Sequence, residues 1–175
     1  MQREIEIKVL NIDVDKIEEK LTSLGAKLIS DEEQENYTYV PKDSKFDNGY
    51  LRIRETKDSN GEKSTEITFK EVKGDDEFRI NDEYTVNIDS ISMMSKILEQ
   101  CGIVLQYQGQ KHRKSYSYKG QRFDIDIWDE KTYPHPYMEI EFSSQDMVDE
   151  ILSDLSIDRS DVTTDSISQL REKLK

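Results

Sequence analysis

Charged side chains of one sign recur two residues apart at several places in the sequence. Successive side chains of a β-strand point to opposite faces, so residues i and i+2 share a face. Clustered carboxylates attract a hard divalent cation, and clustered arginine and lysine side chains attract a polyanion such as phosphate. Together the two kinds of cluster predict a site for a metal ion and a triphosphate. The acidic pairs are Glu4 with Glu6, Asp124 with Asp126 and Glu139 with Glu141; the basic pairs are Arg52 with Arg54 and Lys111 with Arg113, and Lys8 and Lys70 add single charges.

The same alternation also has a plainer interpretation. An antiparallel sheet with one apolar face on the core and one solvated polar face is the commonest arrangement for such segments. Like charges side by side on a sheet repel each other, however, and a merely solvated face gains from mixing the two signs. The segregation by sign therefore favours an external partner for each cluster. The apolar alternates, such as Ile5, Ile7, Ile125 and Ile127, would then point outward.

The charged pairs lie in segments with the period-two alternation of strands. Turn signals at Asn48-Gly49, Asn60-Gly61 and Lys119-Gly120 join neighbouring segments into antiparallel hairpins. The expected strands cover residues 3–10, 36–40, 50–54, 65–72, 83–88, 103–108, 111–118, 122–128 and 137–143.

Four further segments have helical spacing of apolar residues. One begins at Asp13 and ends at Gly25, and another begins near Ser90 or Ser92 and ends at Gly102. Weaker helical patterns cover residues 144–155 and 164–174. The expected class is α+β, dominated by strands.

A faint internal repeat connects the two halves of the chain. The run from Glu6 through Gly25 to Tyr39 has an echo from Glu83 through Gly102 to Tyr116, and both runs give strand, helix, glycine and strand. Two similar halves that close on each other remove the sheet edges by forming a barrel.

Composition limits the possible partners and the compartment. The 175 residues suit a single domain spanning 1–175, and 36% of them are charged, with a formal net charge of -13. This acidity argues against attraction to nucleic acid or membrane surfaces. The single cysteine, Cys101, cannot form an internal disulfide, and the first residues resemble neither a signal peptide nor a membrane span. We therefore expect a cytoplasmic protein.

The charged motifs, taken in order, resemble those of a known family. Glu4-Ile5-Glu6-Ile7-Lys8 is similar to the ExExK signature of the CYTH superfamily, the triphosphate tunnel metalloenzymes. The resemblance implies a closed eight-stranded antiparallel β-barrel, the triphosphate tunnel, with helices packed outside. It also implies that Mg²⁺ or Mn²⁺ is bound by Glu4, Glu6, Asp124, Glu139 and Glu141, and that Lys8, Arg52, Arg54, Lys70, Lys111 and Arg113 hold the triphosphate.

Some positions depart from the family pattern. The middle strand often reads Arg-x-Glu-x-Glu, but residues 81–85 keep only Glu83, and the second strand gives only Tyr39 as a candidate match. Asp126 is equally compatible with a metal ligand, a partner of a ligand or an ion pair with a basic neighbour. The connection over residues 127–137 is either a lid at one tunnel mouth or a rigid loop with Trp128 half-buried.

The resemblance implies an enzyme whose partner is a small-molecule triphosphate. A class IV adenylyl cyclase, which converts ATP to cyclic AMP and pyrophosphate, is the first candidate, because the compact length and the Lys73-Gly74 stretch after Lys70 are similar to that group. The alternative is hydrolysis of the terminal phosphate of inorganic tripolyphosphate or thiamine triphosphate. A non-catalytic triphosphate or polyphosphate sensor is the third. The oligomeric state stays open, and a homodimer is compatible with the sequence.

Overall fold

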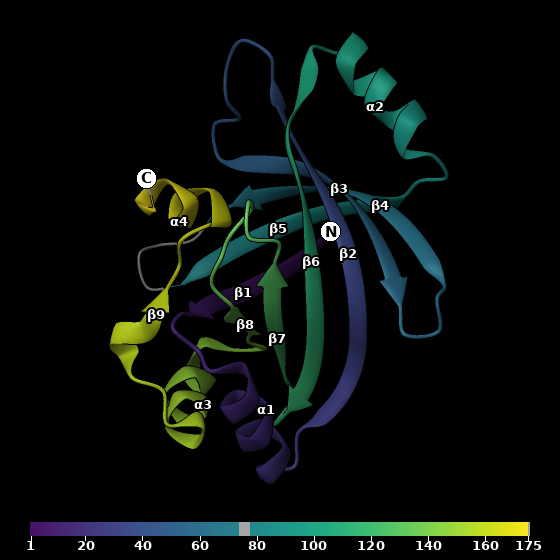
Figure 1. The fold of residues 1–175 in the computed structure, drawn as a ribbon. Coiled ribbons are helices and arrows are strands. Elements are labelled where there is room, and N and C mark those ends of the chain that lie inside the picture. Colours follow the sequence, from purple (N-terminus) through teal and green to yellow (C-terminus); the bar gives the residue numbers. More distant parts are fainter. Residues whose placement is uncertain (74–77, 175) are drawn as a thin grey trace.

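The computed structural model describes residues 1–73 and 78–174 (Figure 1). The strands are β1 (Gln2–Val9), β2 (Lys27–Pro41), β3 (Gly49–Asp58), β4 (Lys63–Val72), β5 (Arg79–Asn87), β6 (Ile103–Tyr118), β7 (Gln121–Trp128), β8 (Tyr137–Glu141) and β9 (Val162–Thr163). The helices are α1 (Val14–Ser23), α2 (Ile91–Gln100), α3 (Val148–Leu155) and α4 (Ile167–Lys173), with short 3-10 turns η1 (Gln145–Met147) and η2 (Arg159–Asp161).

Eight of the strands form a closed antiparallel barrel. Their order is β5-β4-β3-β2-β6-β7-β8-β1, and pairing of β5 with β1 closes the ring. The two-residue β9 adds to β1 outside this ring. The structure thus confirms the predicted class and the eight-stranded barrel.

Corresponding strands of the two sequence halves pair with each other, β1 with β5 and β2 with β6. Each half runs from strand through helix to a left-handed glycine and a long strand. Gly25 follows α1 with φ 83° and Gly102 follows α2 with φ 76°, a conformation that costs glycine little. The barrel is therefore closed by strands from equivalent places in the two halves.

Strand β6 takes the place of two strands that the sequence predicted. Residues 103–108 and 111–118 were expected as separate strands, but they form the continuous β6 through Gly109. A Cβ at Gly109 would lie 2.3 Å from the side-chain oxygen of Thr132. The glycine thus allows the 129–136 loop to approach β6 closely and does not mark a turn.

The apolar face of the strands points out of the barrel, where helices cover it. Ile7, Phe123 and Ile125 pack with Leu21 of α1 and Ile151 of α3 in the largest core cluster. Burial of each such side chain contributes roughly 1.5 to 3 kcal/mol. Helices α1 and α3 lie together at the bottom of the view in Figure 1, and α2 lies at the top, where Leu98 joins Tyr39 and Ile53 in a second core cluster.

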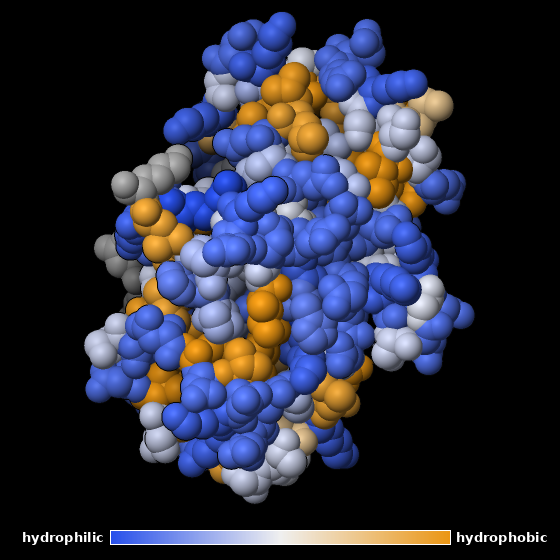
Figure 2. Space-filling model, in the orientation of Figure 1, coloured by the Kyte–Doolittle hydropathy of each residue, from blue (hydrophilic) through white to orange (hydrophobic). Residues whose placement is uncertain are grey.

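The face of the molecule shown in Figure 2 is mostly hydrophilic. On the face shown in Figure 2, polar side chains dominate over β2 and β6, and hydrophobic ones gather beside α2 and near α1 and α3. Within the part of the chain that the structure describes, every helix is too short or too polar to span a membrane.

Candidate active site in the barrel lumen

The barrel encloses a cavity of about 670 Å³ to which all eight strands contribute side chains. Period-two alternation directs the charged residues inward while their apolar neighbours pack outside. Ten of the predicted site residues line this cavity: Glu4, Glu6, Lys8, Arg52, Arg54, Lys70, Lys111, Arg113, Glu139 and Glu141. Glu83, a further candidate, lines it as well.

The acidic pairs and the basic pairs come from different strands, although β1 also carries Lys8. We call Glu4, Glu6, Glu139 and Glu141 the acidic side; they lie on the adjacent strands β1 and β8, where Glu6 is directly opposite Glu141. We call Arg52, Arg54, Lys111 and Arg113 the basic side; they lie on β3 and β6, and β2 runs between these strands. The lumen therefore has one side suited to cations and another suited to anions.

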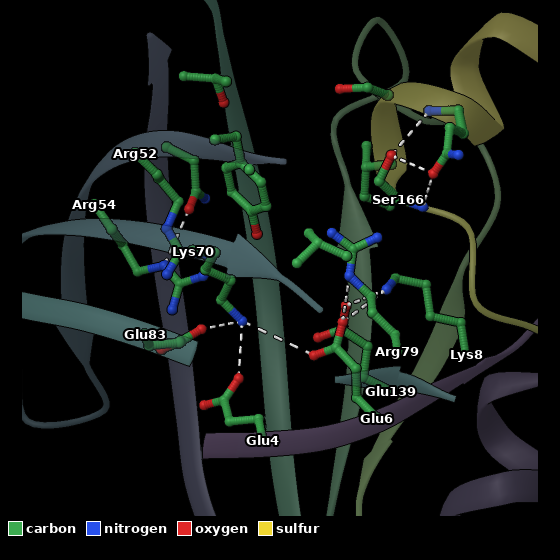
Figure 3. A pocket seen from close by; sticks show the side chains of 18 of the residues that line it. Glu4, Glu6, Lys8, Arg52, Arg54, Lys70, Arg79, Glu83, Glu139 and Ser166 are labelled. Carbon is green, nitrogen blue, oxygen red and sulfur yellow. Dashed lines mark hydrogen bonds and ion pairs between the residues drawn. The ribbon is translucent and has the colours of Figure 1, made fainter. Parts of the chain in front are cut away.

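Several lumen charges compensate each other directly. Lys70 Nζ lies 2.9 Å from Glu4 Oε2 and also forms an ion pair with Glu83 (Figure 3). Lys8 Nζ lies 3.1 Å from Glu139 Oε1, and Arg79 Nε lies 3.2 Å from Glu6 Oε1. The two clusters therefore compensate each other in part within the protein, which alternation within a strand does not show.

Arg113 is the most heavily engaged of these cations. Its guanidinium makes two bonds of 2.6 Å to Asp126, one of 2.5 Å to Asp124 Oδ2 and one of 2.7 Å to Glu139 Oε2. Asp126 also accepts a 2.9 Å hydrogen bond from Lys111 Nζ and is fully buried. Of the three roles left open for Asp126, the structure shows the ion pair with basic neighbours.

The sequence matches a known protein family. The family model described as CYTH domain matches residues 2–171, nearly the whole chain. The chain belongs to the CYTH family. Comparison with curated protein sequences gives no significant match.

Solved structures similar to this CYTH protein share its fold at low sequence identity. The PH1819 protein of Pyrococcus horikoshii is 22% identical, with a TM-score of 0.81 and coverage of 98% of this chain and 99% of that one. A candidate adenylate cyclase of Vibrio parahaemolyticus is 14% identical, with a TM-score of 0.73 and coverage of 98% of both chains. HpAC1 of Hippeastrum, a candidate adenylyl cyclase with a dominant triphosphatase activity, is 17% identical, with a TM-score of 0.69 and coverage of 98% and 96%.

The structure corrects two assignments at positions that depart from the CYTH pattern. Arg79 and Glu83 line the lumen with the fully buried Asn81 between them on β5, so the middle motif reads Arg-x-Asn-x-Glu and begins at Arg79. Sequence reasoning missed Arg79 because it began the motif at Asn81. Tyr39 was placed wrongly as a candidate lumen residue; it packs outside the barrel, and its hydroxyl lies 2.6 Å from Ser95 of α2.

The 129–136 loop is fixed against the barrel. Asp129 accepts hydrogen bonds from the backbone N–H of Gln110 and from both the N–H and the hydroxyl of Thr132. Trp128 is half-buried and donates from Nε1 to the hydroxyl of Tyr137 at 2.8 Å. These contacts match the rigid-loop alternative, and Trp128 and Tyr137 line the cavity.

The acidic residues differ in the direction in which the protein shifts their pKa values. Burial, together with nearby Glu4 and Asp124, raises the pKa of Glu141 to about 7. Burial acts in the same direction on Glu139, but the charges of Lys8 and Arg113 outweigh it and hold the pKa of Glu139 well below its usual range. Negative charge is therefore less compensated around Glu141 than around Glu139.

Two residues of the basic side, Lys111 and Arg54, are buried close to other cations. Burial and the neighbouring Arg113 lower the pKa of Lys111 to about 7. Burial, with Arg52 and Arg113 nearby, lowers the pKa of Arg54 to about 9, so its guanidinium still stays protonated at neutral pH. An anion bound between these groups would relieve their repulsion.

The acidic residues have the chemistry that a hard divalent cation requires, since all their donors are carboxylate oxygens. Within residues 1–73 and 78–174, however, no group of three or more such side chains is already arranged to hold a metal ion. Asp124 does not line the cavity, and its two oxygens accept from Arg113 and Arg122. The donor types fit Mg²⁺ or Mn²⁺, but binding requires some carboxylates to leave their basic partners.

Proposed function

We propose that this CYTH protein is a metal-dependent enzyme that binds a triphosphate in the barrel lumen, with conversion of ATP to cyclic AMP and pyrophosphate as the first candidate reaction. The observation that best supports this proposal is the presence of an acidic side and a basic side in one enclosed cavity. A triphosphate with its metal ion presents both signs of charge in one ligand, so it matches both sides at once.

The basic residues are proposed to hold the phosphates. Arg52 and Arg54 point into the cavity from one strand, and their planar guanidinium groups suit bidentate contacts with phosphate oxygens. Lys8, Lys70, Lys111 and Arg113 add charge from other strands. By holding the chain of phosphates at several points, these residues would fix the position of the reacting phosphorus.

The acidic residues proposed to hold Mg²⁺ or Mn²⁺ are Glu4, Glu6, Asp124, Glu139 and Glu141. A divalent ion at such a site neutralises charge that develops on phosphate oxygens. Lys8 and Arg113 now pair with Glu139, and if both turned to phosphate the Glu139 oxygens would be available to hold the ion. After this exchange each buried charge would still have a partner. An unpaired buried charge would be costly.

Two observations support a nucleoside triphosphate as the substrate. The cavity, at about 670 Å³, is within the usual size range of small-molecule sites, and it includes the aromatic side chains Phe46, Tyr50, Tyr107 and Trp128. The candidate cyclase of Vibrio parahaemolyticus has the same fold. The stretch similar to class IV cyclases reaches residues 74–77, which lie outside the described residues. In cyclisation the ribose 3'-hydroxyl attacks the α-phosphorus and pyrophosphate leaves.

Hydrolysis of tripolyphosphate or thiamine triphosphate is the second candidate. Water then attacks a terminal phosphorus, and the charged lining alone serves this reaction without a nucleoside pocket. The triphosphatase activity of HpAC1, which has the same fold, supports it. A non-catalytic sensor is the weakest candidate, since capture of an anion does not require the two glutamates of β1 and the two of β8.

Product identification separates the candidates. Purified protein is incubated with ATP, tripolyphosphate or thiamine triphosphate in the presence of Mg²⁺ or Mn²⁺. Cyclic AMP with pyrophosphate supports the cyclase, and free phosphate supports the hydrolase. A raised melting temperature without turnover supports the sensor. Absence of both turnover and any thermal shift with all three compounds would overturn the proposal.

A further inference from the structure

The strand between the two basic pairs carries neutral side chains into the lumen. On β2, Asn36 and Thr38 line the cavity, and β2 is paired with β3 on one side and β6 on the other. Asn36 is directly opposite Arg54 of β3 and Gly109 of β6. It therefore occupies the middle of the basic side.

Asn36 is almost completely buried, at 1% exposed, yet only one half of its amide is used. Its Oδ1 accepts a 3.0 Å hydrogen bond from Arg54 Nε. Its Nδ2 is buried and has no hydrogen-bond partner among the residues that the structure describes. A buried donor without a partner is costly, and such groups are normally satisfied by protein, water or ligand.

We infer that Asn36 is a substrate-binding residue, whose Nδ2 donates to a phosphate oxygen of the triphosphate while Oδ1 holds Arg54 in place. This inference rests on the proposed function and adds an uncharged member to its phosphate-binding residues. The type of side chain matters. A further cation would add to the repulsion among Arg52, Arg54 and Arg113, whereas a carboxylate would pair with Arg54 and repel phosphate.

An amide avoids both problems because it presents an acceptor and a donor without net charge. The acceptor binds the guanidinium through Nε, so the terminal nitrogens of Arg54, of which Nη1 lies 3.8 Å from Glu66 Oε1, can also contact the phosphate. The donor is available for a second phosphate contact. Asn36 and Arg54 would thus bind the same triphosphate as one hydrogen-bonded unit.

The direct test is nuclear magnetic resonance of the wild-type protein with tripolyphosphate and Ca²⁺. The side-chain amide signal of Asn36, assigned by its loss in Asn36→Asp, is expected to shift downfield on binding. The signal of Asn87, which is exposed on β5 and outside the cavity lining, is expected to stay in place. An Asn36 amide that does not respond to bound tripolyphosphate would overturn the inference without requiring any variant to fold.

Calorimetric titration of tripolyphosphate into two variants gives a second test. Asn36→Asp keeps the acceptor for Arg54 but replaces the donor and adds a negative charge. Thr38→Asp adds the same charge on the same strand, opposite Arg52, without removing that donor. We expect Asn36→Asp to bind at least about tenfold more weakly than Thr38→Asp, since it also loses a hydrogen bond to a charged group. Equal affinities would mean that charge alone acts, and the inference would fail.

The same titration distinguishes failure of the inference from failure of the proposed function. If wild-type protein does not bind tripolyphosphate, the proposed function fails and the inference fails with it. If wild type binds, Arg52→Ala weakens binding and Asn36→Asp equals Thr38→Asp, only the inference fails.

Discussion

Asp126 holds Arg113 in a bidentate ion pair, with Nε 2.6 Å from Oδ1 and Nη2 2.6 Å from Oδ2. The same carboxylate accepts from Lys111 at 2.9 Å, and none of the three side chains is more than 7% exposed. Asp126 therefore fixes two neighbouring cations of β6 in the positions from which they face the lumen.

Asp126→Asn is expected to lower the free energy of unfolding by about 3 to 5 kcal/mol, because buried Lys111 loses its ion-pair partner and Arg113 loses one of its three carboxylates. Urea denaturation measures the change. Asp82→Asn is the matched control, since Asp82 pairs with Arg3 and Lys73 outside the barrel, where both partners are substantially exposed. A smaller loss is expected there. Equal losses in the two variants would show that the buried ion pairs of Asp126 contribute no more to stability than the outer ion pairs of Asp82.

Arg52→Ala and Arg54→Ala should each weaken tripolyphosphate binding by about one to three orders of magnitude. Each change removes one or two contacts to a charged ligand. Arg→Lys at either position should recover only part of the loss, because lysine restores charge but not the bidentate geometry. Calorimetric titration with Ca²⁺ as the metal measures these affinities, and Arg3→Ala on the outer face serves as control. If all these proteins bind equally, the basic half of the proposed site is wrong.

Glu141→Gln is expected to stabilise the metal-free protein at high pH. The folded protein raises the pKa of Glu141 to about 7 from 4.5, so between these values the folded state binds more protons and stability falls as pH rises. Removing the carboxyl should increase the free energy of unfolding at about pH 8 by up to about 3 kcal/mol, and the gain should vanish below about pH 4.5. Urea denaturation in the presence of a chelator at both pH values checks the sign.

Glu6→Gln provides the contrasting case. Glu6 forms ion pairs with Lys8 and Arg79, and these charges with Lys70 outweigh the effect of burial and lower its pKa. The variant should therefore be less stable than wild type at about pH 8, where Glu141→Gln is more stable. Both variants should lose metal-dependent turnover, because each removes a proposed ligand. Full turnover in either one at ordinary Mg²⁺ or Mn²⁺ concentrations would contradict the ligand assignment.

Tyr39→Phe should leave tripolyphosphate affinity and turnover unchanged. Its hydroxyl bonds to Ser95 of α2 outside the barrel. Loss of that hydrogen bond should lower the free energy of unfolding by about 1 kcal/mol. Titration and urea denaturation of the same preparation test both statements, and a tenfold loss of affinity would place Tyr39 back among the candidate site residues.

The local pattern of the sequence determined the family, the class of fold and the face on which each charge lies. Ile5 and Ile7 alternate with Glu4 and Glu6, and this spacing alone separates outer from inner side chains because the strand repeat is two residues. The grouping of charges by sign then pointed to a lumen with an acidic and a basic side.

The partners across the lumen were decided only by the tertiary structure. Glu6 faces Glu141 across β1 and β8, and Lys70 reaches Glu4, although the members of each pair are far apart in the sequence. Such contacts depend on the register between strands and on closure of the barrel, and a shift of register by one residue would exchange the two faces. Side-chain alternation within one strand contains no information about that register. For the same reason the sequence could not show that Arg113 is shared by three carboxylates or that the Asn36 amide is left with a free donor.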